Sequence, residues 1–141
     1  MAYDKAADIA ILYSDEPYSY AASLNDYQLY DEALIGQTVY AAGFPSAVGT
    51  YTTSSGIVVQ SIKLRDHMHY ELDMVADYGF SGGPVINEDC KVLGMITSSY
   101  DSPEGMKVYA VSFDEIRQLM AQAKPDSLMK LTDFYNETHN N

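Results

Sequence analysis

The sequence has few of the residues that form disulfides or bind nucleic acid: one cysteine and only eight lysines and arginines among 141 residues. A single cysteine, Cys90, excludes an internal disulfide. It follows Glu88 and Asp89, whose carboxylates disfavour a reactive thiolate, so we interpret Cys90 as structural or incidental. Many exported bacterial proteins also lack disulfides, so the compartment stays open.

Basic residues are scarce beside 20 aspartates and glutamates, and the net charge is −12 at pH 7. Such a surface repels phosphates, which excludes nucleic acid as a partner. No apolar stretch is long enough for a membrane span. Residues Met1 to Lys5 do not lead into a signal-peptide pattern, so we expect nothing in this chain to direct export. The acidity itself indicates solubility rather than a particular ligand.

The chain suits one domain and divides into three regions by pattern. Residues 1–34 begin with a short apolar run at 8–12 and continue as an irregular connector. Residues 35–124 contain short strands between turn residues, which is typical of an antiparallel barrel or sandwich, and then a helix. Residues 125–141 form a polar tail, which we expect to be loose after a short helical turn near Leu128 to Leu131.

The strands are predicted by β-branched and alternating apolar residues, with a polar turn at Arg65 and Asp66. We expect them at residues 39–42, 56–59, 62–64, 70–74, 92–97 and 107–111. Ser112 and Glu115 have the spacing of a capping box, in which each side chain bonds a free amide at the start of a helix. Lys124 and Pro125 are expected to end that helix.

The segment Gly79-Phe80-Ser81-Gly82-Gly83-Pro84 contains the clearest functional motif. A serine attacks an acyl carbon only if its hydroxyl is exposed and two backbone amides converge on the developing oxyanion. Glycines before and after Ser81 permit the tight backbone path that aims those amides. Taken alone, the segment also fits a glycine-rich hairpin turn with an incidental serine.

This segment resembles the G-x-S-G-G-P nucleophile loop of trypsin-like (chymotrypsin-fold) serine proteases. Residues 8–12, Asp-Ile-Ala-Ile-Leu, are similar to the strand that bears the triad aspartate in that family. Further resemblance, chiefly to bacterial HtrA-like and glutamyl-endopeptidase-like members, lies at residues 36–45, 54–58, 92–97 and 109–123. The order of these segments matches the family. The resemblance implies an all-β fold: an antiparallel chymotrypsin-like barrel with a C-terminal α-helix.

The resemblance also implies roles for individual residues. Ser81 would be the nucleophile, and the amides of Gly79 and Ser81 would form the oxyanion hole. Asp8 would orient the catalytic imidazole and stabilise its protonated form. Such chemistry implies a serine endopeptidase that acts on peptide or protein substrates through an acyl-enzyme, with no cofactor and no metal.

The substrate-binding positions that the resemblance implies are Val75, Thr97, Ser98 and Ser99. Val75 stands where the family floors the pocket for the residue before the scissile bond, and an apolar floor disfavours lysine or arginine there. The Thr97 hydroxyl is expected to donate a hydrogen bond to Asp8. His67 and His69 alternate on a strand without a clear third ligand, which argues against a metal site.

The catalytic histidine is the part of the family pattern that this sequence lacks. In the family it precedes the aspartate, but here the three histidines, His67, His69 and His139, all follow Asp8. We therefore expect an incomplete C-terminal half, with the N-terminal barrel largely absent and no activity alone. Losing the base lowers turnover on the order of a million-fold.

Two further expectations follow from that absence. Surface that faces the absent barrel would be exposed, which predicts self-association or binding of a separately supplied barrel. The alternative function is a non-catalytic peptide-binding module that holds an extended peptide along the edge from Thr97 to Tyr100.

Overall fold

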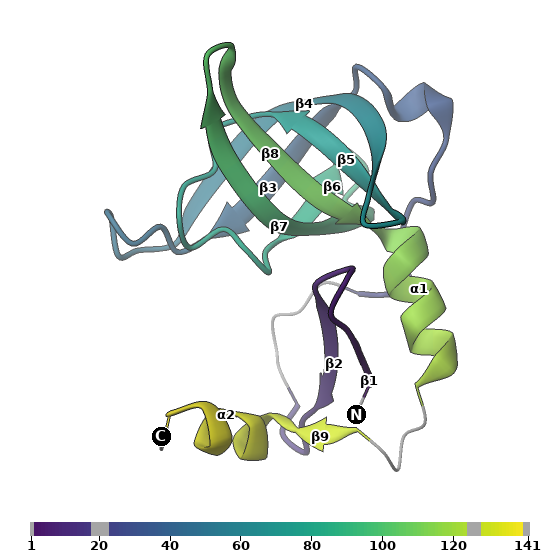
Figure 1. Cartoon of the computed structure of the whole chain (residues 1–141), viewed down its shortest axis with the longest axis vertical. Coiled ribbons are helices and arrows are strands. Elements are labelled where there is room, and N and C mark those ends of the chain that lie inside the picture. Colours follow the sequence, from purple (N-terminus) through teal and green to yellow (C-terminus); the bar gives the residue numbers. More distant parts are fainter. Residues whose placement is uncertain (1, 18–22, 124–127, 140–141) are drawn as a thin grey trace.

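Six antiparallel strands close into a barrel, seen in the upper part of Figure 1. The structure is a computed structural model that describes residues 2–17, 23–123 and 128–139. The strand order around the barrel is β3-β4-β5-β8-β7-β6. The strands are β3 (Thr38–Gly43), β4 (Thr52–Leu64), β5 (His67–Asp73), β6 (Pro84–Asn87), β7 (Val92–Ser102) and β8 (Gly105–Ser112). The predicted all-β barrel is confirmed.

The strands differ from their predicted bounds in two places. β4 is one strand of 13 residues where the pattern predicted two, because a bulge between Val58 and Gln60 interrupts the alternation without breaking the strand. β6 was not predicted, since its four residues are too short to show a period. Fully buried side chains that fill the barrel include Val39, Val58, Tyr70, Leu72, Val85, Leu93, Ile96 and Val108.

A second, smaller layer lies below the barrel in Figure 1. It contains the strands β1 (Ala2–Asp4), β2 (Ile9–Tyr13) and β9 (Met129–Lys130), in the order β1-β2-β9. The helix α2 (Leu131–His139) follows β9, and the 3₁₀ helix η1 (Glu32–Leu34) lies in the connector. Residues 129–139 of the tail predicted to be loose are therefore structured, because β9 pairs in parallel with β2 and Lys130 makes a 2.7 Å ion pair with Asp15.

The helix α1 (Phe113–Gln122) begins where the sequence predicts, but the capping box is wrong. The Ser112 hydroxyl makes no cap bond, and it is buried without a hydrogen-bond partner in the described part of the chain. Glu115 turns instead to β5, where its carboxylate accepts the Met68 amide at 2.8 Å and lies 2.9 Å from Nδ1 of His67. These two contacts of a carboxylate with the barrel outweigh the local cap. The predicted end at Lys124 and Pro125 lies outside the described residues.

Two contacts attach the β1–β2 hairpin to the barrel. A small core joins Ala7 and Ile9 to Val111, with Met95, Ile116 and Leu119 packed against it. His67 lies between two carboxylates, since its Nε2 is 3.6 Å from Asp4 while Nδ1 faces Glu115. One histidine therefore links the hairpin, β5 and α1.

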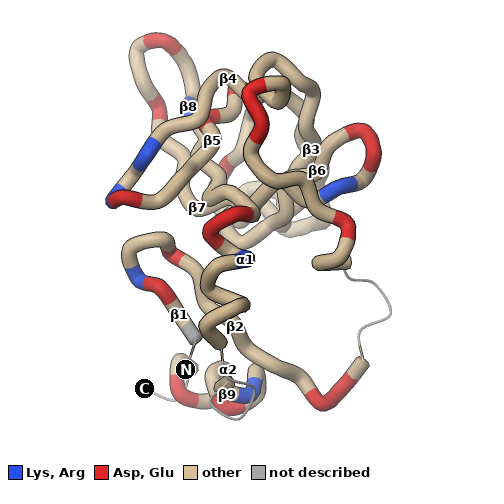
Figure 2. The backbone as a smooth tube through the Cα atoms, turned by 90° about the vertical axis from the view of Figure 1, so that its right-hand side faces the viewer, with Lys and Arg blue, Asp and Glu red and all other residues tan. Residues whose placement is uncertain are grey.

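Acidic segments are distributed over the barrel loops and the lower layer, whereas basic segments are few (Figure 2). Among the described residues, no helix has the length and apolar character to cross a bilayer.

We predict that the bond between Glu115 and β5 makes stability depend on pH. Partial burial raises the pKa of Glu115, but the Met68 amide and His67 outweigh it, so the pKa lies below its ordinary value of 4.5. A lowered folded pKa adds stability above the unfolded pKa, and this stability is lost as pH falls through the folded pKa. Urea denaturation of Glu115→Gln should show a smaller loss of stability than wild type between about pH 6 and about pH 3.5.

The control is Glu88→Gln, which changes an exposed glutamate on the β6–β7 turn and should keep the wild-type pH dependence. Identical pH dependence in Glu115→Gln and wild type would contradict the role given to Glu115.

Candidate active site

Ser81 lies on an exposed turn between β5 and β6, held at both sides by backbone bonds. Phe80 is buried in the barrel core and so attaches the turn to the barrel. On the far side, the Gly82 amide donates to the Ile96 carbonyl at 2.7 Å, and the Ile96 amide donates to the Gly83 carbonyl at 2.9 Å. These two bonds fix the turn against β7, so Ser81 is both exposed and firmly placed.

Backbone amides around Ser81 divide into bonded and free donors. The amides of Phe80, Gly82 and Gly83 donate to the carbonyls of Asp77, Ile96 and Phe80. In the described part of the chain, the amides of Gly79 and Ser81 have no acceptor. An oxyanion site needs two free donors directed at one point, and this turn leaves two amides free. The turn therefore offers a vacant pair of N–H groups beside the serine hydroxyl.

Gly79 has no tolerable substitute in this turn. Its φ is +105°, a left-handed conformation that glycine adopts without strain. Its carbonyl accepts the Phe44 amide at 3.0 Å, which brings the turn against the end of β3. A Cβ at this position would collide with the Phe44 carbonyl. The sequence Gly43-Phe44-Pro45 thus serves as the platform on which the Ser81 turn rests.

Asp8 closes the β1–β2 hairpin, with its side chain exposed between the buried residues Ala7 and Ile9. Its φ is +60°, which aspartate tolerates better than most residues. The amides of Ala6 and Ala7 donate to the Asp4 carboxylate at 2.9 and 3.1 Å and shape this turn. The pKa of Asp4 lies below its ordinary value, chiefly because the Ala7 amide donates a hydrogen bond to its carboxylate. The hairpin therefore places Asp8 next to the barrel.

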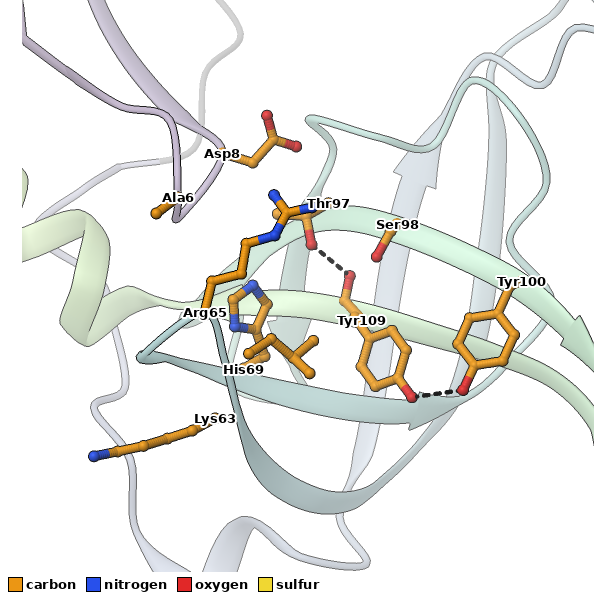
Figure 3. Close-up of a pocket in the computed structure, with 10 residues that line it drawn as sticks. Ala6, Asp8, Lys63, Arg65, His69, Thr97, Ser98, Tyr100 and Tyr109 are labelled. Carbon is orange, nitrogen blue, oxygen red and sulfur yellow. Dashed lines mark hydrogen bonds between the residues drawn. The ribbon is translucent and has the colours of Figure 1, made fainter.

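Asp8 and the Ser81 turn approach the same short part of β7 from two directions. Asp8 and Thr97 line one cavity of about 580 Å³, shown in Figure 3. Gly82 bonds to Ile96, the neighbour of Thr97. The Thr97 hydroxyl donates to the Tyr109 carbonyl at 3.4 Å rather than to Asp8, so the hydrogen bond predicted between Thr97 and Asp8 does not form. A bulge between Ile96 and Ser98 redirects this hydroxyl.

The histidines of the chain have other partners. His67 is held by Asp4 and Glu115, and Nδ1 of His139 lies 3.0 Å from the Tyr135 carbonyl in α2. His69 is buried and lines the cavity with Asp8, but its Nδ1 lies 3.0 Å from the His67 carbonyl. Within the described residues no histidine hydrogen-bonds to Ser81 or Asp8. No group of metal-ligating side chains converges among them either.

Three of the four predicted substrate positions are exposed, and the fourth, Thr97, is half-buried. Ser98 and Ser99 are exposed on the outer half of β7. There β7 pairs with β8 only, because its pairing with β6 ends at Met95. Val75 follows β5 and is 71% exposed. The described chain therefore leaves one edge of β7 open from Thr97 onward.

The sequence patterns did not predict the cavity beside this edge. Tyr109 contributes to it, with its hydroxyl 3.1 Å from that of Tyr100. The bond to Tyr100, with burial and the charge of Glu71, raises the pKa of Tyr109 above its usual range. Arg65 contributes from the β4–β5 turn. The sequence showed Arg65 only as a turn residue, since nothing local indicates that β4, β7 and β8 meet there.

Comparisons with known proteins show which family this chain resembles. A family model described as a trypsin-like peptidase domain matches residues 1–95. Serine proteases HTRA1B and HTRA1A of Danio rerio are each 29% identical over 128 residues, or 85% of this chain. The chain covers 26% of each of these relatives, about a quarter of their length.

Solved structures show a similar fold. A serine endoprotease from Yersinia pestis is 27% identical with a TM-score of 0.53, over 62% of this chain and 30% of that one. Rv3671c from M. tuberculosis, in an inactive form, has a TM-score of 0.57 over 85% of this chain and 61% of that one. Its identity is 17%, so it supports the fold alone.

We predict unequal effects of alanine at two glycines of the Ser81 turn. Gly82 has a φ of +85° but open space around it, so Gly82→Ala should cost about 1–2 kcal/mol from backbone strain. Gly79→Ala adds the collision with Phe44 and should cost about 3 kcal/mol or more. Urea denaturation measures both losses, and equal losses would show that the turn does not rest on Phe44.

Proposed function

The chain belongs to the trypsin-like peptidase family, and we propose that it supplies the nucleophile of a serine endopeptidase. The observation that supports this most is the pair of unbonded amides at Gly79 and Ser81, on a turn whose other amides are bonded. These two donors lie beside the exposed Ser81 hydroxyl on a turn that is fixed against β7. An acyl-transfer site needs both.

In the proposed reaction the Ser81 hydroxyl attacks the carbonyl carbon of a peptide bond. Its proton passes to an imidazole, and the carbonyl oxygen becomes an oxyanion that accepts bonds from the amides of Gly79 and Ser81. The imidazolium then protonates the leaving amine as the C–N bond breaks. Water, deprotonated by the same imidazole, hydrolyses the acyl-enzyme and restores Ser81.

Asp8 acts on the imidazole rather than on the substrate. Its carboxylate fixes the tautomer and stabilises the positive charge that forms during attack. Its place at the end of a hairpin anchored by Ala7 and Ile9 suits that role. His67, His69 and His139 are bonded elsewhere, so we propose that the imidazole comes from outside these 141 residues.

The proposed substrate is a peptide or protein segment in extended form. It would pair with the open edge of β7 at Thr97, Ser98 and Ser99, as an added strand. Val75 near the Ser81 turn would disfavour lysine or arginine before the scissile bond. The same open edge favours a second candidate: a module that binds the peptide without cleaving it.

We expect a fluorophosphonate probe to label Ser81 in the protein extended upstream to include the proposed histidine-bearing half. Ser81→Ala should abolish labelling. Asp8→Asn should slow it by about 10⁴-fold, since the imidazole then holds the wrong tautomer. The 141-residue chain alone should label at least about 10³-fold more slowly than the extended form. Mass spectrometry of the labelled peptide identifies the site.

Ser55→Ala provides the matched control, because Ser55 is exposed on β4 and outside the site. It should label like wild type. A folded extended protein that binds peptides but stays unlabelled would sink the catalytic proposal and favour the binding module.

A further inference from the structure

The cavity beside the open edge of β7 is lined by groups that suit an anion. Arg65, His69 and the tyrosines Tyr100 and Tyr109 surround it, together with Thr97 and Ser98. Arg65 extends from the β4–β5 turn toward Thr97, while the nearby Lys63 extends away from it (Figure 3). Hydroxyl and guanidinium groups are donors that a carboxylate accepts well.

Arg65 has no carboxylate partner in the described part of the chain. The ion pairs there involve His67, Lys107 and Lys130 only. Five of the seven described lysines and arginines make no ion pair, so what distinguishes Arg65 is its place at the cavity. An unpaired guanidinium at the rim of a cavity is therefore free to bind a ligand.

The backbone at Arg65 is strained. Arg65 and Asp66 have φ values of +51° and +66° in the two-residue turn between β4 and β5. Such a turn favours asparagine or glycine, and an arginine in this conformation costs on the order of 1 kcal/mol. The two-residue hairpin itself requires a positive φ at both positions. Its first residue, Arg65, lines the cavity with its side chain extended toward Thr97 (Figure 3).

From these observations we infer that the cavity recognises an acidic side chain of the peptide that pairs with β7. The inference rests on the proposed function and specifies its substrate class. Side chains at alternate positions of an extended peptide share one face. An aspartate or glutamate two or four residues before the scissile bond would face the cavity and accept bonds from Arg65.

One lining group opposes this preference. Among the described residues that line the cavity, Asp8 is the only carboxylate, and it would repel an acidic ligand. The chain as a whole also repels acidic peptides, since its net charge is −12. A measured preference for the acidic peptide therefore has to come from a local site.

The test uses the 141-residue chain and two fluorescein-labelled peptides, Val-Glu-Val-Glu-Val-Val and the same sequence with glutamine for glutamate. Fluorescence anisotropy should show the acidic peptide binding about tenfold more tightly at about 50 mM salt, and less than about twofold more tightly at about 0.5 M. Arg65→Asn, which suits the left-handed turn, should abolish the difference without weakening the glutamine peptide. Arg65→Lys should retain part of the difference in affinity between the two peptides.

Lys91→Asn is the control, because Lys91 is exposed and lies outside the cavity. It should keep the full difference. Equal affinity for the two peptides, a difference that survives Arg65→Asn, or no binding of either peptide would each overturn the inference. Labelling of Ser81 is measured separately, so acid recognition can fail while the peptidase proposal stands.

Discussion

The two hydrogen bonds between the Ser81 turn and Ile96 are the constraint on which the rest of the site depends. The Gly82 amide and the Gly83 carbonyl both bond to this one residue of β7. Because Ile96 is itself buried in the barrel, the turn inherits the rigidity of the core. Thr97, the next residue, then begins the open edge where a peptide can pair. Nucleophile and peptide edge are thus placed by the same strand.

The β1–β2 hairpin, which carries Asp8, is attached to the barrel by a separate set of contacts. Ala7 and Ile9 pack against Val111, and His67 lies between Asp4 and Glu115. These contacts hold Asp8 at β7 although no strand of the hairpin belongs to the barrel. The geometry of the proposed site therefore joins two units that the chain stabilises differently: a barrel closed by backbone bonds, and a hairpin attached by a small core and one histidine.

The sequence predicted the barrel because β-branched residues and turn residues recur at strand spacing, and it predicted the Ser81 turn because its glycines are local. Local sequence patterns could not predict contacts between segments that are distant in the chain. Glu115 looked like a cap partner for Ser112, yet the Met68 amide 47 residues away donates a hydrogen bond to its partly buried carboxylate. The pairing of β9 with β2 and the position of Arg65 at the cavity also depend on contacts between segments that are distant in sequence. The roles of Asp8, Gly79, Ser81, Val75 and the β7 edge remain proposals.

Amide hydrogen exchange of the 141-residue chain, followed residue by residue by NMR, tests the central claim most directly. The account predicts that the amides of Gly79 and Ser81 exchange at nearly unprotected rates, while those of Gly82 and Gly83 are slowed by their bonds to Ile96 and Phe80. That pattern would mean a vacant pair of donors on a fixed turn. Protection of Gly79 and Ser81 equal to that of their neighbours would contradict the account, because the oxyanion would then find no free donors.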